Sequence, residues 1–209
     1  MDKGLLIIVS GFSGAGKGAI VKEIMRKHND YGLSVSATTR QPRPGEIEGV
    51  HYFFISKEDF EKRIADDELL EYARYVDNYY GTPREYVEQM LDRGMNVILE
   101  IEMQGAMKVK ARMPEAITVF VSTEDVDTLE SRLNGRGTES GEQIRKRLER
   151  AVEESDYMMQ YDYVLINDDL EKTAETLDGI VRAEHNKTKF NTDFIYSMQK
   201  ELKSRFGNK

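Results

Sequence analysis

The sequence predicts an α/β protein in which helices cover both faces of a central parallel sheet, giving three layers. Two observations carry this prediction. Short apolar runs rich in β-branched residues alternate with segments of helical periodicity, and a glycine-rich turn joins the first run to the first helix. With 209 residues and 39% hydrophobic composition, the chain is long enough for one sizeable domain, or for one domain that carries insertions.

Composition argues against several classes of function. A net charge of -8 disfavours sequence-independent binding to nucleic acid, because a polyanion has to be met by an excess of positive charge. The longest apolar run near the start, Leu5 to Val9, is far too short for a signal peptide or a membrane span, so we expect a cytoplasmic protein without membrane contact. The absence of cysteine excludes disulfides and thiolate metal sites, and the three scattered histidines do not suggest a metal cluster.

The first elements are a strand and a helix joined by glycines. LLIIVS, Leu5 to Ser10, is typical of a buried central strand. KGAIVKEIMRKH, Lys17 to His28, predicts a helix with Val21, Ile24 and Met25 on its buried face.

The pattern then changes to shorter pieces. From Leu33 to Thr82 the strand-like segments LSVSATT, VHYFFIS and ELLEYARYV are separated by QPRPGEIEG and by one helix that starts near Ser56, where S-K-E-D has the form of a capping box. This predicts a small mixed insertion. GTPREYVEQMLDRG predicts the next helix, with Thr82 as N-cap, Pro83 in the first turn and Gly94 at the end.

The second half of the chain resumes the alternation. We expect a buried strand from Asn96 to Ile101, a helix stopped by Pro114, a strand from Ala116 to Ser122, two charged helices from Glu124 to Asn134 and from Glu142 to Met159, a strand from Asp162 to Asn167, and a long polar helix from about Leu170. Ser140 and Gln143 have the form of a capping box for the second charged helix. The tail is rich in lysine and asparagine.

The glycine-rich turn has the spacing of a phosphate-binding loop. GFSGAGKGAI, Gly11 to Ile20, contains G-x-x-x-x-G-K between a strand and a helix, so that backbone N–H groups face an anion and Lys17 reaches the outer phosphates. The hydroxyl residue expected to hold magnesium is missing, because Gly18 and Ala19 follow the lysine. A glycine turn without a ligand is the alternative.

Arginines form a second signal. TTRQPRPGE places Arg40 and Arg43 in a loop stiffened by two prolines, which lowers the entropic cost of presenting two guanidinium groups to one phosphate. Three further arginines, Arg132, Arg136 and Arg147, follow on the charged helices and their connecting turn and are able to converge. A solvated charged surface is the alternative for both groups.

Acidic residues at strand ends form a third signal. Glu71 lies within ELLEYARYV, and Glu100 and Glu102 lie within VILEIEMQG. Ligands of an open α/β sheet gather at the carboxyl ends of its strands, where such acids orient waters on magnesium or accept hydrogen bonds from a base. Ordinary charged strand ends are the alternative.

Taken together, seven segments resemble the guanylate kinase family: SGFSGAGKG, SVSATTRQPRPGE, EGVHYFF, NYYGTP, ILEIEMQGA, RLNGRGTES and INDDL, in this order, from about Leu5 to Ala183. The resemblance implies a P-loop kinase fold with a core at about 1–33, 83–123 and 160–209, a GMP-binding insertion at about 34–82 and a helical lid at about 124–159. It also implies transfer of the γ-phosphoryl group of ATP to GMP or dGMP, with Mg²⁺ as cofactor.

The resemblance assigns roles to individual residues. ATP would be held by Gly11, Phe12, Ser13, Gly14, Ala15, Gly16, Lys17, Gly18, Ala19 and Asn167; the GMP phosphate by Arg40, Arg43, Tyr52 and Tyr80; and guanine by Ser36, Glu71, Thr82 and Glu102. The catalytic set would be Lys17, Arg40, Arg132, Arg136 and Arg147. Magnesium would be bound through phosphates and water, with Glu100 and Glu102 in its outer shell.

The chain departs from the family pattern at three places. Phe12 stands where proline is common, Glu102 stands where many members have aspartate, and Gly18 and Ala19 leave out the hydroxyl after the lysine. Since magnesium keeps several waters and takes phosphate oxygens, water can replace that hydroxyl. We therefore expect an active enzyme with weakened magnesium affinity.

Two other readings compete with the kinase. A guanylate-kinase-like scaffold domain would bind phosphorylated peptides without catalysis, but such domains typically lose the ATP loop or the lid arginines, which this chain retains. A P-loop ATPase acting on nucleic acid fits poorly with the acidic charge. A homo-oligomer, for example a dimer through the C-terminal helix, is compatible with the sequence, although nothing in its pattern requires one.

Overall fold

The computed structural model of the chain describes residues 3–135 and 141–207. Its centre is a 5-stranded sheet in the order β2-β7-β1-β8-β9, and every pairing within it is parallel. The strands are β1 (Leu6–Gly11), β2 (Tyr31–Leu33), β7 (Asn96–Glu100), β8 (Ile117–Ser122) and β9 (Tyr163–Ile166). The predicted parallel α/β core is therefore confirmed.

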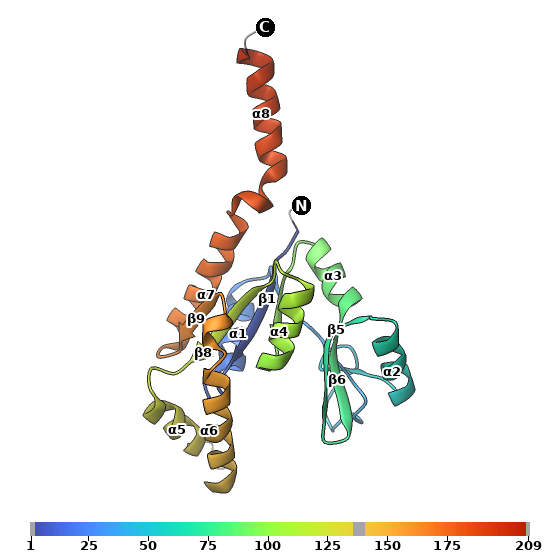
Figure 1. Ribbon diagram of the computed structural model, residues 1–209, viewed down its shortest axis with the longest axis vertical. Coiled ribbons are helices and arrows are strands. Elements are labelled where there is room, and N and C mark those ends of the chain that lie inside the picture. Colours follow the sequence, from blue (N-terminus) through green and yellow to red (C-terminus); the bar gives the residue numbers. More distant parts are fainter. Residues whose placement is uncertain (1–2, 136–140, 208–209) are drawn as a thin grey trace.

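Alternation along β1 divides the core into two layers of side chains. Ile7 and Val9 pack in one apolar cluster with helices α1 (Lys17–Lys27) and α7 (Leu170–His185). Leu6 and Ile8 point to the opposite face, where α3 (Arg84–Asp92) and α4 (Met103–Arg112) cover the sheet. Figure 1 shows these helices around the central strands.

The prediction for α1 is wrong at one residue, Met25. Ile20, Val21 and Ile24 face the sheet and are buried, whereas Met25, expected on that face, is 37% exposed. The helix docks with positions i, i+1 and i+4 toward the core, and the next position along turns to solvent.

The predicted insertion forms a separate mixed sheet in the order β4-β3-β6-β5. Its elements are β3 (Ala37–Thr38), β4 (Phe53–Phe54), α2 (Lys57–Ala65), β5 (Leu69–Tyr75) and β6 (Asn78–Pro83). Ser56 caps α2 as expected, because its hydroxyl accepts the backbone N–H of Asp59 at 3.0 Å. In Figure 1 this sheet and α2 stand to the right of the core.

The predicted N-cap role of Thr82 is wrong. Thr82 lies in β6, a strand that the sequence had not indicated, and α3 begins only at Arg84, with no side-chain cap. The Thr82 side chain is buried and its hydroxyl donates instead to the Glu71 carboxylate at 2.8 Å. The buried Thr82 hydroxyl needs an acceptor, and that requirement prevails over the local preference of threonine for a helix end.

The charged helical pair forms α5 (Val126–Asn134) and α6 (Gly141–Ser155), followed by η1 (Met158–Gln160). Leu129 and Leu133 of α5 pack against Ile144 of α6, and Phe12 of the glycine loop packs against this cluster. The predicted capping residue Ser140 lies outside the described residues, as does Arg136.

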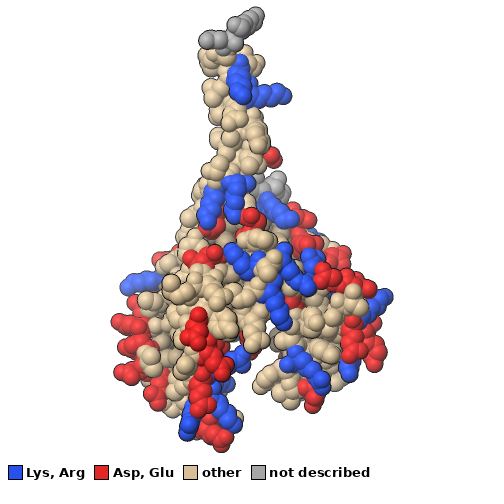
Figure 2. Space-filling model, viewed as in Figure 1, with Lys and Arg blue, Asp and Glu red and all other residues tan. Residues whose placement is uncertain are grey.

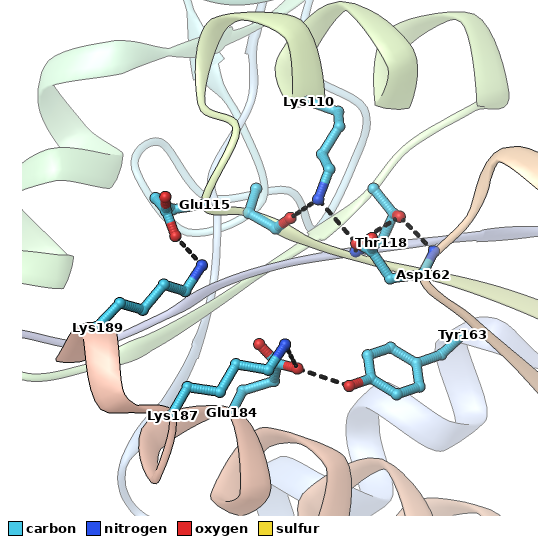
Figure 3. Close-up of polar contacts among 9 residues, drawn as sticks. Lys110, Glu115, Thr118, Asp162, Tyr163, Glu184, Lys187 and Lys189 are labelled. Carbon is cyan, nitrogen blue, oxygen red and sulfur yellow. Dashed lines mark hydrogen bonds and ion pairs between the residues drawn. The ribbon is translucent and has the colours of Figure 1, made fainter. Parts of the chain in front are cut away.

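The C-terminal segment ends in a helix where the sequence indicated only a polar tail. After η2 (Thr188–Phe190), α8 (Thr192–Phe206) projects away from the body in Figure 1. A polar network holds the segment before α8, as Figure 3 shows: buried Glu184 accepts hydrogen bonds from Tyr163 and Lys187, and Lys189 pairs with Glu115. Among the described helices, none combines the length and apolarity that a membrane span requires.

Candidate active site

A cavity of about 700 Å³ opens at the carboxyl ends of β1 and β7, between the second sheet and α6. Figure 2 shows the surface hollowed between these two parts of the molecule. Among the residues that line the cavity are the predicted site residues Gly11, Ser13, Lys17, Ser36, Tyr52, Glu71, Tyr80, Glu100, Glu102 and Arg147. The structure thus brings residues of the glycine loop and residues of the insertion to one space.

The glycine loop has a backbone that other residues rarely adopt. Gly16 precedes α1 with φ at +95°, and a Cβ there would lie 2.4 Å from Nδ2 of Asn167. Gly11 has φ at +140°, and a Cβ there would lie 2.0 Å from the carbonyl oxygen of Val121. No acidic side chain stands in the first turn of α1, so nothing within the helix neutralises the positive end of its dipole, which favours an anion.

Lys17 folds back over this loop. Its ammonium donates to the carbonyl oxygens of Gly11 at 2.7 Å and of Phe12 at 3.0 Å. These are contacts that phosphate oxygens are able to replace, since carbonyl and phosphate oxygens accept from the same donor.

Two of the three predicted lid arginines contact the loop. Arg132, in the last turn of α5, donates to the carbonyl oxygens of Asn167 at 2.8 Å and of Ala15 at 3.4 Å, and the Asn167 amide donates to Ala15 at 2.7 Å. Arg147, on α6, donates to the Ser13 hydroxyl. Both charged helices therefore contact the loop through an arginine.

Glu71 is a half-buried acid of the cavity wall. Burial raises the pKa of its carboxyl, and the Thr82 hydrogen bond and the charge of Lys108 only partly offset that effect. Gly105 packs closely against it, because a Cβ there would lie 3.1 Å from Oε2 of Glu71. Thr82 supports the carboxylate from behind, outside the wall of the cavity, and Ser36 is part of the wall.

Arg40 and Arg43 lie outside the described wall of the cavity. The Arg40 guanidinium forms two hydrogen bonds of 2.9 Å to the two carboxylate oxygens of Glu46 and lies 5.2 Å from the centre of the Tyr52 ring. This pair raises the pKa of Arg40 and lowers the pKa of Glu46 to about 2. Arg43 is exposed, and its backbone N–H donates to Glu46 at 2.7 Å.

Glu100 and Glu102 take different positions. A Cβ on Gly18 would lie 3.4 Å from Oε2 of Glu100, so this carboxylate stands beside the start of α1. Glu102 instead accepts a hydrogen bond of 2.6 Å from Arg150, which also lies 3.3 Å from Glu154.

The sequence reasoning missed Arg150, Glu154, Lys108 and Glu46. The one signal for Arg150 was its position three residues after Arg147, which places both on the same face of a helix. Glu154, four residues further on, falls on that face as well. Glu46 stands in the same loop as Arg40, but nothing in the sequence shows that the two pair.

Comparisons with known proteins agree on one family. The model of the guanylate kinase family matches residues 3–184. The chain is 46% identical over 199 residues to a guanylate kinase of Caldanaerobacter subterraneus subsp. tengcongensis, covering 95% of this chain and 97% of that protein. It is 47% identical over 203 residues to a guanylate kinase of Clostridioides difficile, covering 97% and 99%.

A solved structure matches as well. The crystal structure of guanylate kinase from Anaplasma phagocytophilum superposes with a TM-score of 0.73 at 29% identity, covering 100% of this chain and 98% of that one. A family model over most of the chain and relatives of such similarity along nearly its whole length lead to one conclusion: the chain belongs to the guanylate kinase family.

Proposed function

We propose that this chain transfers the γ-phosphoryl group of ATP to GMP or dGMP, giving ADP and GDP or dGDP, within purine nucleotide metabolism in the cytoplasm, where its nucleotide substrates occur. The observation that carries the proposal is the shared cavity: Lys17 of the glycine loop and Glu71 of the second sheet line one space of about 700 Å³. A kinase needs the donor phosphates and the acceptor in one enclosure, because transfer in line requires both oxygens near one phosphorus.

Glu71 supports guanine as the base of the acceptor. Guanine presents N1–H and N2–H donors to an ionised carboxylate, whereas adenine presents an acceptor at N1 and would meet Glu71 lone pair to lone pair. A site built on such hydrogen bonds discriminates by about 10⁴ or more. Ser36 and Glu102 complete the pocket in this proposal, and Thr82 orients the Glu71 carboxylate from behind.

The phosphoryl transfer needs no covalent intermediate. A phosphate oxygen of GMP bonds to the γ-phosphorus as the bond to the β,γ-bridging oxygen breaks, and the released electron pair stays on ADP. Lys17, Arg132 and Arg147 neutralise charge on the donor phosphates, together with Arg136 of the lid. Arg40, Arg43, Tyr52 and Tyr80 hold the acceptor phosphate, for which Arg40 has to exchange its Glu46 partner.

The division into core, insertion and lid is part of this proposal. The lid at about 124–159 contains α5 and α6, whose arginines already contact the glycine loop, and the insertion at about 34–82 contains most of the second sheet. Movement of both parts toward the core would exclude water, which otherwise hydrolyses ATP.

Magnesium fits the donor set at the start of α1, with the phosphates as its main ligands. Within residues 3–135 and 141–207, no cluster of three or more His, Cys, Asp and Glu is placed to hold a metal by itself. Glu100 beside Gly18 is positioned to hold waters of an ion bound to ATP. When bound, magnesium supplies charge neutralisation of the phosphates.

One experiment tests the proposal against a phosphopeptide-binding scaffold. The protein is mixed with ATP, magnesium and GMP, ADP release is followed, and the assay is repeated with AMP, CMP and UMP. Turnover with GMP alone among the four is expected. Absence of GMP turnover would favour the scaffold, and turnover with AMP alone would mean that the base pocket is misassigned.

A further inference from the structure

Helix α6 contacts both halves of the cavity through one face. Arg147 donates to Ser13 of the glycine loop, and Arg150, one turn later, donates to Glu102 beyond the end of β7. Residues three apart on a helix are neighbours on its surface, so one rigid element links the donor loop to an acid of the proposed guanine pocket. In Figure 1, α6 stands on the opposite side of this space from β5 and β6.

Arg150 lies between two carboxylates. One of its terminal nitrogens is 2.6 Å from Oε2 of Glu102, and its Nε is 3.3 Å from Oε1 of Glu154. The Glu154 side chain is 13% exposed, and the positive charge of Lys17 acts on it. Charges therefore alternate across the cavity wall, from Lys17 through Glu154 and Arg150 to Glu102.

The charge state of Glu102 affects the ionisation of Glu71. Both carboxylates line the cavity, and the negative charge of Glu102 is one of the causes that raise the pKa of Glu71. Guanine needs ionised acceptors, because a protonated carboxyl would oppose a donor to its N–H groups. A cation fixed on Glu102 weakens the repulsion and keeps both acids available.

We propose that Arg150 is a positioning residue for guanine: by holding and neutralising Glu102 it sets the acceptor geometry of the base pocket and ties α6 to a bound purine. The inference rests on the proposed function. The alternative is that Arg150 competes with guanine for Glu102 and has to be displaced before GMP binds.

The test uses the full chain with four single variants and one double variant. Arg150→Met removes the charge and keeps the length of the side chain, Arg150→Lys keeps the charge, and Glu102→Gln removes the partner. Arg145→Met is the matched control, since Arg145 on the same helix also pairs with a glutamate four residues later, at 2.9 Å, but lies outside the cavity wall. The double variant of Glu102→Gln and Arg150→Met completes a cycle. The Arg150 pair is half-exposed, so the melting temperatures should stay close to that of the wild type.

We expect Arg150→Met to raise the KM for GMP about fivefold, the upper range for an exposed ion pair, with the KM for ATP unchanged. Calorimetric titration of GMP should show the same factor, Arg150→Lys should restore most of it, and Arg145→Met should change nothing. In the Glu102→Gln background, removal of Arg150 should have no further effect. A KM for GMP that is unchanged or lower, or an equal loss in both backgrounds, overturns the inference. If the wild type does not turn over GMP, the proposed function itself is wrong.

Discussion

Replacement of Glu71 by glutamine should lower the affinity for GMP and raise the stability of the fold. The carboxylate accepts the Thr82 hydroxyl at 2.8 Å, and the amide oxygen of glutamine can keep that bond. Its NH₂ group, however, would face a guanine N–H donor across the pocket. Loss of one charge-assisted hydrogen bond and a donor-to-donor contact together cost about 3 kcal/mol, or roughly 100-fold in the KM for GMP.

Stability should rise in the same variant. Burial raises the pKa of Glu71, which means that the folded protein bears a cost for keeping this group ionised. Removal of the charge should stabilise the fold by about 1 kcal/mol, or about 3 °C in melting temperature for a chain of this length. The difference in free energy of unfolding between variant and wild type is full above the raised pKa of folded Glu71. It shrinks as the pH falls through that pKa, because the wild-type carboxyl takes up a proton. It vanishes well below the ordinary value of 4.5, where Glu71 is protonated in the folded and the unfolded chain.

Two measurements check the Glu71→Gln prediction. ADP release against GMP concentration gives the KM, and thermal unfolding from pH 4 to pH 8 gives the stability difference. Glu61→Gln, at an exposed site on α2, serves as the control and should alter neither quantity. If Glu71→Gln binds GMP normally, Glu71 is not the base acceptor; if it lowers the melting temperature at neutral pH, the argument from burial is wrong.

Four further predictions concern two positions of the glycine loop, the acceptor phosphate and one helix. Gly18→Ser fits without a clash and should lower the magnesium concentration for half-maximal rate about fivefold, whereas Gly18→Ala should not; an unchanged magnesium requirement refutes the idea that the missing hydroxyl weakens binding. Arg43→Ala should raise the KM for GMP about tenfold and leave ATP binding nearly intact; calorimetry that shows an equal loss for both nucleotides would contradict the assignment. Gly16→Ala should weaken ATP binding and lower the melting temperature, because its Cβ would lie 2.4 Å from Asn167 at a φ of +95°. Gly179→Ala, a helical position with open space around it, should instead stabilise the protein by about 1 kcal/mol, and a loss of stability there would show that the helix does not tolerate the methyl group.

The parallel core was predictable because its signal is local. Runs such as Leu6–Gly11 and Ile117–Ser122 are apolar on both faces, and only a central strand between two helical layers requires that. The short strand Tyr31–Leu33 was not predicted, because three residues are too few to show the alternation of a strand. Strand Asn78–Pro83 was missed because glycine and proline interrupt its pattern, and these residues are depleted in strands.

The site also contains residues that the sequence predicts and residues that it does not. Lys17 and the glycines around it follow from spacing, since the loop builds its anion site from its own backbone. Partners that meet only through folding do not follow: Arg150 and Glu102 are separated by 48 residues, and Glu71 and Thr82 meet because β5 and β6 pair as adjacent strands. The mistaken N-cap at Thr82 has this origin, because a pattern read along the chain cannot see a carboxylate that arrives from another strand.

Binding of two anionic nucleotides by a chain of net charge -8 depends on exchange of partners. The cations proposed to meet phosphate already hold oxygen acceptors: Arg40 holds Glu46, and Arg132 and Lys17 hold backbone carbonyls. Each phosphate oxygen replaces one of these acceptors, so the net gain per contact is smaller than the gross attraction. Selectivity must then come from geometry, because an anion that fails to match all the displaced acceptors at once leaves a desolvated cation behind.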